Sequence, residues 1–420
     1  MPKTDSKPKA AANIAPGDNR QKPYRNPWFV VPFAVTAVLG MVVLRACGKG
    51  PDDDDGVNRS APIHSAEAMQ RGNSLAGRNG AAAAKAPAAK TAADSGAENV
   101  SPKPRSVLCT MVYPTTVDLA RPDAKNFVPT NPEHPESALF GSVRTGSDGR
   151  ARFHKGVDIA PQKKDRKGRA LDSVYAVAAG RVAYVNRVAG DSNYGIHVVL
   201  LHSDPIGDVY TLYAHLASVA DGLKVGQTVE PGTVLGVMGN TANSAIPLWR
   251  SHLHFEVGLV HSSRFGAWCD ENGVKPNRGN FHGWNMHPVN PLTFFPHFAR
   301  HATTTFGEYL ATVPAGVELV VANPKNRIPE YFGRYPSLWN GPVAWSGPIV
   351  LSVSDSGLIL GGRPANEAEC ETLAQSKARA AILAVHENIL GRNGVRLVAK
   401  DGKGWVLGKA LTRWLDTLWY

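Results

Sequence analysis

Two histidines separated by one residue stand out in the segment SHLHFEVG, residues 251–258. Read with the two-residue period of a strand, His252, His254 and Glu256 share one face, and the apolar residues between them face a core. A lone histidine at such a place is more often structural than functional. Two imidazoles side by side on an open strand face indicate a metal site or an acid–base pair.

Further residues of the same chemical kind occur elsewhere in the chain. The segment FHKGVDIAP (153–161) offers His154 and Asp158, with Gly156 between them to let the backbone bend, and LYAHLASV (212–219) offers His215. Two histidines and one carboxylate suit zinc, which keeps one position open for water in catalytic sites. Four histidines and one aspartate exceed the three protein ligands of such a site, so two imidazoles are free for acid–base work or oxyanion stabilisation.

In this arrangement the chain resembles the M23 family of zinc metallopeptidases, the lysostaphin or LytM type that cuts peptidoglycan peptides. The resemblance runs from about Phe140 to Phe295, and the order H-x3-D, Y-x-H-L, H-x-H is highly specific. The segments that carry it are FGSVR, FHKGVDIAP, VYAVAAGRVAYV, NYGIHVVLLH, LYAHL, LKVGQTVEPGTVLGVMGNT, SHLHFEVG and NPLTFF. The resemblance implies that His154, Asp158 and His254 bind one zinc ion per catalytic domain, with His215 and His252 as the catalytic pair.

The chemistry implied by this resemblance follows from charge. Zinc lowers the pKa of its water towards ~7 and polarises the scissile carbonyl. A neutral His252 or His215 takes the proton, and the protonated form stabilises the oxyanion or protonates the leaving amine. The sequence leaves open which histidine has which role. Tyr213 shares the face of His215, and we expect it to be a core residue.

Two segments depart from the family pattern. Where a short Gly-rich turn is usual before H-x-H, this chain has NTANSAIPLWR (240–250), with Trp249 close to the site. After the strand, an insert rich in Gly, Asn, Trp and His spans 261–289, and we expect it to wall or cover the substrate groove. The insert's three histidines are irregularly spaced, which favours solvated loop residues over a second metal site; they are His261, His282 and His287.

The elements that must position these residues are short apolar runs divided by Gly, Pro and Asp turns, over residues 106–300. They predict a mainly β peptidase domain, an antiparallel β-sandwich or open barrel, in agreement with the resemblance. Residues 223–239 are interpreted as two strands that pair across a Pro231-Gly232 turn.

Residues 301–420 predict a small α+β domain of unknown function. The runs 317–322 and 348–354 are strand-like, and Asn366 with Glu369 is typical of a capping box that opens a helix ending near Gly391. The last twelve residues predict an apolar-faced helix. Five of the nine tryptophans lie in this region, where core packing is favoured for most of them over a surface that binds the wall or an envelope protein partner.

The N-terminal part predicts a membrane anchor. Residues 1–26 hold six Lys/Arg against two Asp, and the run 27–44 has no charged side chain. Eighteen helical residues at about 1.5 Å each span about 27 Å, just enough for a bilayer core. The charge balance places residues 1–26 as a cytoplasmic tail, 27–45 as a single transmembrane span through the inner membrane, and the rest on the periplasmic side. The long polar lead disfavours a cleaved signal peptide, and Arg45 disfavours lipidation of Cys47.

Composition bounds the remainder of the chain. Residues 48–105 are rich in Ala, Gly, Pro, Lys and Asp, which predicts a disordered linker that lets the enzyme reach a mesh above the membrane. The formal charge of +11 is not accompanied by a nucleic-acid-binding module, so it indicates attraction to anionic wall or membrane surfaces instead. The four cysteines lack C-x-x-C spacing and are not the zinc site; Cys109 and Cys269 bracket the peptidase module and are candidates for a disulfide.

These observations predict a membrane-anchored zinc metalloendopeptidase that hydrolyses peptide bonds in peptidoglycan cross-links or stem peptides. The alternative is a non-catalytic regulator of the same fold, which binds and activates a separate cell-wall hydrolase. Retention of all five site residues disfavours that alternative. A weaker possibility is an enzyme that trims a protein partner in the envelope.

Overall fold

The computed structural model describes residues 105–145, 151–391 and 393–420. The predicted cytoplasmic tail, transmembrane span, Cys47 and linker lie outside the described residues. Within the described ranges, none of the helices combines the length and apolar character needed to cross a bilayer.

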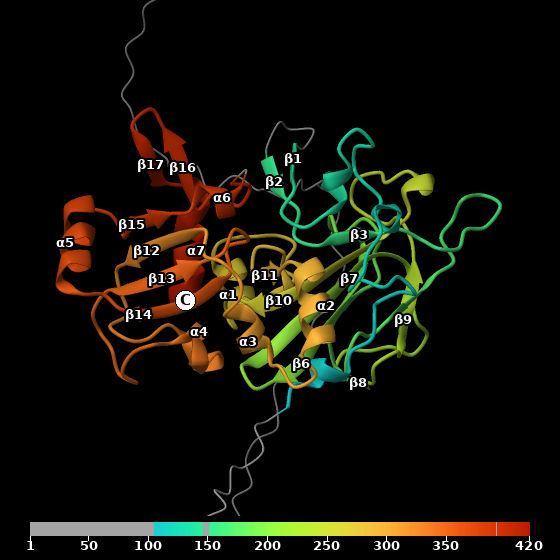
Figure 1. The fold of residues 1–420 in the computed structure, drawn as a ribbon, viewed down its shortest axis with the longest axis horizontal. Helices are drawn as coiled ribbons and strands as arrows, with labels where there is room; N and C mark the ends of the chain where they lie inside the picture. Colours follow the sequence, from blue (N-terminus) through green and yellow to red (C-terminus); the bar gives the residue numbers. More distant parts are fainter. Residues whose placement is uncertain (1–104, 146–150, 392) are drawn as a thin grey trace, which may run out of the picture. The chain divides into compact units, whose positions relative to one another are not determined.

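The region predicted to be a peptidase domain is built on an antiparallel sheet of nine strands (Figure 1). Along the main path the strand order is β11-β10-β7-β6-β5-β8, while β3 pairs with β10, and β9 pairs with both β4 and β7. The strands are β3 (Val157–Ile159), β4 (Ser173–Tyr175), β5 (Gly180–Asn186), β6 (Ile196–Asp204), β7 (Gly207–Val219), β8 (Thr228–Val229), β9 (Val234–Met238), β10 (Leu253–Val260) and β11 (Met286–Val289). A separate hairpin joins β1 (Val143–Thr145) and β2 (Ala151–Phe153). The prediction of an antiparallel β fold is confirmed, and closure into a sandwich or open barrel stays a prediction.

Strand β10 lies between β3 and β7, and this placement brings distant parts of the sequence together. Opposite His254 stand Asp158 of β3 on one side and Ala214 of β7 on the other. On the other face of β10, Phe255 packs edge-on against Tyr213 in the hydrophobic core. The predicted alternation of faces is therefore correct. The predicted open face is wrong, because His252 and His254 are only 2% and 5% exposed.

The segment 223–239 does contain two strands around the Pro231-Gly232 turn, but they do not pair with each other. Strand β8 pairs with β5, whereas β9 pairs with β4 and β7. Gly232 has a φ of +83°, and the Thr233 N–H donates to the Glu230 carbonyl at 3.0 Å. The turn thus sends the chain to different sheet neighbours, because an isolated two-stranded hairpin is only marginally stable, whereas β8 and β9 each join the larger sheet.

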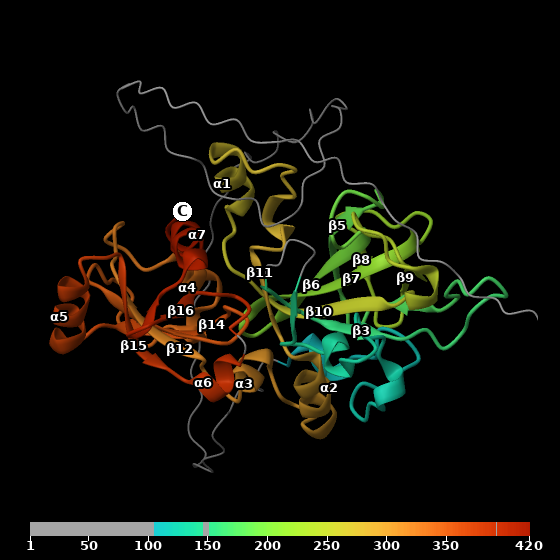
Figure 2. The same ribbon diagram turned by 90° about the horizontal axis from the view of Figure 1, so that it is seen from above.

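The C-terminal region contains a four-stranded antiparallel sheet of order β14-β13-β12-β15, with α5 packed beside it (Figure 2). Its strands are β12 (Val317–Val321), β13 (Ile349–Val353), β14 (Ile359–Pro364) and β15 (Ala380–Val385), followed by the hairpin β16 (Val398–Asp401) and β17 (Gly404–Leu407). The predicted strands at 317–322 and 348–354 are confirmed. The predicted α+β character is confirmed as well, and the domain boundary near residue 300 stays a prediction.

The helices confirm one prediction and correct another. The C-terminal helix α7 (Lys409–Trp419) is present as predicted, and the Asn366 capping box does open α5 (Glu367–Ser376). That helix does not continue to Gly391, because Lys377 adopts a left-handed φ of 53° and the chain then enters β15. The other helices are α1 (Phe265–Glu271), α2 (Pro291–Arg300), α3 (Phe306–Leu310), α4 (Glu330–Arg334) and α6 (Glu387–Leu390), with short 3-10 turns at Val107–Thr110, Ala124–Asn126, Pro135–Ala138, Leu248–Arg250, Gly279–Phe281 and Pro336–Leu338.

The insert at 261–289 forms a small core of its own. Phe265, Trp268 and Cys269 of α1 are buried together with Val274. The insert contacts α7, because His261 donates from Nε2 to the Trp414 carbonyl at 2.9 Å. The prediction of solvated histidines is wrong: His261 and His282 are each 2% exposed and His287 is 4% exposed.

The predicted disulfide and the C-terminal tryptophans have different outcomes. Cys109 and Cys269 are free thiols, and Cys109 donates instead to the Thr304 carbonyl at 3.0 Å. The disulfide is therefore not formed. All five C-terminal tryptophans pack into or against the hydrophobic core, as favoured from the sequence.

Candidate metal centre

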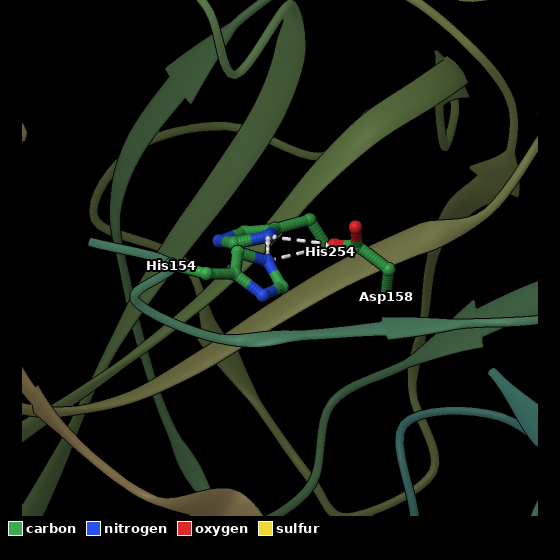
Figure 3. A group of neighbouring side chains, drawn as sticks. All are labelled: His154, Asp158 and His254. Atoms are coloured by element: carbon green, nitrogen blue, oxygen red, sulfur yellow. Dashed lines mark hydrogen bonds and ion pairs between the residues drawn. The ribbon is translucent and has the colours of Figure 1, made fainter. Parts of the chain in front are cut away.

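Three ligand atoms meet at one point between β10 and the segment around β3. His154 Nε2 lies 3.0 Å from Asp158 Oδ1 and 3.1 Å from His254 Nδ1, and His254 Nδ1 lies 3.0 Å from the same carboxylate oxygen. Figure 3 shows both imidazoles turned towards that oxygen. Among the described residues this is the one group of three or more potential ligands that meet closely enough for a metal.

The protonation of the two ligand histidines is fixed by their outer nitrogens. His154 donates from Nδ1 to the Leu139 carbonyl at 2.8 Å, since a carbonyl only accepts. His254 donates from Nε2 to the Glu256 carboxylate at 2.9 Å for the same reason. When both imidazoles are neutral, their inner nitrogens carry the lone pairs that a metal needs, directed at the Asp158 carboxylate oxygen.

This donor set fits zinc. Ligands at about 2.0–2.2 Å from a tetrahedral ion lie roughly 3.3–3.6 Å from one another, close to the separations of 3.0–3.1 Å in the triad. Burial alone would lower the pKa of His254, but its hydrogen bonds to Asp158 and Glu256 raise the pKa to about 9. The surroundings thus favour positive charge at this point, which a bound cation supplies.

Asp158 stays ionised because Arg144 holds its second oxygen. The Arg144 guanidinium donates to Asp158 Oδ2 at 2.6 Å and also to the Ser137 carbonyl. Burial opposes the charge, yet Arg144 and the neighbouring imidazoles keep the pKa of Asp158 well below its usual value. The carboxylate is fully buried and available as a metal ligand.

Glu256 is a buried carboxylate on the same strand face that orients His254. It is fully buried, and it accepts from the Tyr194 hydroxyl at 2.7 Å and the Tyr210 hydroxyl at 3.0 Å as well as from His254. Such outer carboxylates fix the tautomer of metal-binding histidines and raise their basicity. Burial opposes ionisation of Glu256, but the bond from His254 lowers its pKa overall.

The sequence placed Glu256 on the histidine face without assigning it a role, and it assigned none to Tyr194 or Arg144. For Glu256 the signal was present in the i, i+2 spacing from His254. Tyr194 lies in the segment between β5 and β6 and Arg144 in β1, and the periodicity of β10 contains no information about either.

His215 and His252 lie next to each other beside the triad. Their ring centroids are 4.8 Å apart, and His252 Nε2 lies 3.6 Å from Asp158 Oδ1. His215 donates from Nδ1 to the Thr241 carbonyl at 2.8 Å, and His252 donates from Nδ1 to the Arg250 carbonyl at 2.6 Å. In the neutral state the Nε2 atom of each ring therefore has a free lone pair.

Both imidazoles are held in their neutral form. Burial, assisted by the charges of His252 and His254, keeps the pKa of His215 well below its usual value, and burial likewise lowers the pKa of His252. His215 has a left-handed φ of 61°, at a place where the register between β6 and β7 shifts. A left-handed non-glycine residue is strained, and such strain is typical of functional sites. The His215 ring lies beside the rings of His252 and His254, with centroids 4.8 and 5.8 Å away.

Two other residues near the site have structural roles. Tyr213 is a core residue, as expected, since its hydroxyl accepts from the Val177 N–H at 3.0 Å. Gly156 is required for close approach: a Cβ there would lie 2.3 Å from the Phe255 carbonyl oxygen. This glycine lets β3 lie against β10, so that Asp158 reaches His254.

Comparison with known proteins identifies the peptidase region. Residues 152–264 match the sequence model of Peptidase family M23. No curated protein sequence matches the chain. These residues are therefore similar to the peptidases of family M23, and the metal triad expected from that similarity is present at His154, Asp158 and His254.

Solved structures also match over part of the chain. A zinc-containing peptidase from Vibrio cholerae is 24% identical, over 37% of this chain and 35% of that chain, with a TM-score of 0.24. The catalytic domain of the antimicrobial peptidase lysostaphin from Staphylococcus simulans is 27% identical, over 28% of this chain and 75% of that domain, with a TM-score of 0.21. The chain thus spans about a third of the length of the Vibrio structure.

Proposed function

We propose that this protein is a zinc metalloendopeptidase that hydrolyses peptide bonds in peptidoglycan cross-links or stem peptides. The observation that carries the proposal is the convergence of three buried lone-pair donors beside two neutral imidazoles. A purely structural histidine cluster has no need to bring three ligand atoms within 3.1 Å of one another beside two further imidazoles. The family M23 match over residues 152–264 supports the same reaction class.

His154, Asp158 and His254 would hold the zinc ion. When bound, zinc supplies Lewis-acid chemistry: it polarises a carbonyl oxygen and makes water more acidic. Arg144 and Glu256 keep the ligands aligned, since each binds the atom of a ligand side chain that points away from the triad.

The imidazoles of His215 and His252 perform the proton transfers. A neutral Nε2 accepts a proton from the attacking water, whose oxygen forms the new bond to the scissile carbonyl carbon. The resulting imidazolium then donates a proton to the amine as the C–N bond breaks. The carbonyl groups of Thr241 and Arg250 hold each Nδ1–H, so that every proton moves through Nε2.

We further propose that residues 27–45 anchor the chain in the inner membrane, with the peptidase domain on the periplasmic side. The uncharged run and the charge balance of residues 1–26 support this orientation. The C-terminal region is proposed to contact an envelope protein, and the intact triad disfavours a purely regulatory role.

The proposal is tested by digesting purified peptidoglycan with the full-length chain. Cleavage should release peptide fragments, stop when a chelator removes zinc, and return when zinc is restored. Release of sugar fragments with intact peptides, or no release by zinc-loaded protein, would refute it. A reporter that is active only outside the cytoplasm, fused after residue 60, tests the proposed topology and should be active.

A further inference from the structure

A pocket of about 270 Å³ opens at the start of β10. Four chain segments line it: the segment 165–171, Ala217 of β7, the end of β9 with the residues after it, and the turn before β10. Both apolar and polar side chains line it, among them Leu171, Met238, Leu248, Asp165, Arg169 and Ser251. Pockets that are mainly apolar with a few polar groups are typical small-ligand sites.

The floor of this pocket is the backbone that holds the two imidazoles. Ser251 directly precedes His252, and the His252 N–H donates to the carbonyl of Gly239, another pocket residue, at 3.0 Å. Ala217, which also lines the pocket, lies two residues after His215. The pocket thus adjoins the backbone of both imidazoles, and an extended peptide advances ~3.3 Å per residue along such a surface.

The segment beside the pocket is a strongly basic hairpin. Residues 163–169, KKDRKGR, contain five cations and one carboxylate, and the cationic residues are all exposed. Asp165 is already paired, because Arg169 Nε donates to its Oδ2 at 2.7 Å. The charges of Lys163, Arg166 and Lys167 therefore face solvent next to the pocket with no acidic neighbour inside the hairpin.

Several contacts hold this basic hairpin in place. Buried Asp172 accepts from the backbone N–H groups of Gln162 and Lys163 at 3.0 Å each. Lys164 Nζ donates to the Trp249 carbonyl at 3.1 Å, which ties the hairpin to the turn before β10. Charges on a fixed support bind a ligand with less loss of entropy than charges on a free loop.

Large apolar side chains are exposed around the same mouth. Leu171 is 53% exposed, Leu248 is 36% exposed, and Trp249 is 59% exposed. Exposed apolar groups close to a functional site mark a contact surface. The ligand that suits this surface has a short apolar part for the pocket and a negative group for the basic hairpin.

We infer that the basic hairpin and its pocket form a subsite that selects acidic peptides, binding a free carboxylate close to the scissile bond. The inference rests on the proposed function and names the substrate class of the same site. Substrate peptides with ionised side-chain or terminal carboxyl groups are then cut in preference to the same peptides with neutral carboxamides. Clustered charge of one sign beside a cleft accelerates binding of opposite charge by 10-fold or more.

The test uses full-length protein and one cross-linked stem-peptide dimer in two forms, with free carboxylates or with all carboxylates converted to amides. The variant K163Q/R166Q/K167Q removes three exposed charges while leaving the Asp165–Arg169 pair and the Lys164 contact. The control K224Q/K325Q/R327Q removes the same charge from exposed positions outside the hairpin.

For wild-type protein we expect kcat/KM to be about tenfold higher on the free-carboxylate form. The hairpin variant should lose about tenfold on that form, mainly through KM, and nothing on the amide form. The control variant should match wild type on both forms. Equal losses on both forms, or no preference by wild type, would overturn the inference.

Failure of the proposed function gives a separate result. If wild-type protein cuts neither form, the proposed function fails, and fluorescence anisotropy of the two labelled peptides then decides on the subsite. Tighter binding of the free-carboxylate form by wild type than by the hairpin variant supports the subsite. Equal binding of the two forms by both proteins overturns it.

Discussion

Two groups of buried histidines lie at the two ends of β10, and they differ in the charges around them. At the start of the strand, His252 and His254 join His154 and His215 around Asp158 and Glu256. Just after its end, His261 lies beside His287, with ring centroids 5.0 Å apart. His261 donates to the Trp414 carbonyl and His287 to the Ser356 carbonyl at 3.2 Å, and the other nitrogen of each ring has no hydrogen-bond partner.

The first group contains buried carboxylates and the second contains none. This difference determines whether the histidines can bind a metal. In the metal centre, Asp158 completes a triad and Glu256 aligns His254. In the second group, burial lowers the pKa of His261 to about 4, and both rings serve as neutral donors that hold the C-terminal region against β10 and β11. Buried histidines alone therefore do not make a metal site.

The largest effect should come from removing a metal ligand. His154→Ala, Asp158→Ala or His254→Ala should each largely empty the zinc site, because two ligands remain where three are needed. Zinc content of the purified proteins, measured by elemental mass spectrometry, checks this. His287→Ala is the matched control from the other end of β10 and should keep about one zinc. Equal zinc content in all four proteins would contradict the assignment of His154, Asp158 and His254 as the metal ligands.

The next effect separates ligands from proton carriers within the metal centre. His252→Ala and His215→Ala should keep zinc but reduce kcat by roughly 100-fold or more, the usual range for acid–base groups. Zinc content and kcat measured on the same preparations check this. Loss of zinc from either variant would show that its imidazole is a ligand.

A smaller effect should follow from the carboxylate that aligns His254. Glu256→Gln keeps the shape of the side chain but removes the charge, and zinc affinity should fall about 10- to 100-fold. Titration with a competing chelator measures this. Tyr210→Phe removes one donor to Glu256 and leaves the carboxylate bonded to His254, so it should cost less. Unchanged affinity in Glu256→Gln would make Glu256 a core residue without influence on the metal.

The smallest effect concerns the second group and depends on pH. Because the pKa of His261 is about 4 in the folded protein and 6.5 is its ordinary value, the unfolded chain takes up the proton first on acidification. The stability that neutral His261 confers on the folded protein is complete above pH 6.5 and falls as pH drops towards 4. At pH 5 the free energy of unfolding is lower by about 2 kcal/mol. Denaturant unfolding of wild type and His261→Gln between pH 7 and 5 should show a steeper loss for wild type. Parallel losses would show that His261 does not titrate on unfolding.

The metal centre was predictable from sequence because its ligands lie in short motifs with fixed spacing. His154 and Asp158 are four residues apart, and His252 and His254 share one strand face. The insert was less predictable, because its burial depends on α7, which follows more than a hundred residues later. The end of α5 and the pairing of β8 and β9 were also less predictable. In both cases, sheet strands distant in sequence determine where the helix ends or which strand is the neighbour. Local patterns identify an element, and distant partners decide how far it extends and what covers it.

The most direct test of the account is mass spectrometry of the fragments that zinc-loaded protein releases from purified peptidoglycan, with zinc-loaded His252→Ala as control. We predict new peptide amino termini and intact glycan strands for wild type, and at most about one hundredth of that release for the variant. Release at the same rate by both proteins, or no new amino termini from wild type, would contradict the assignment of this site as a peptidase centre.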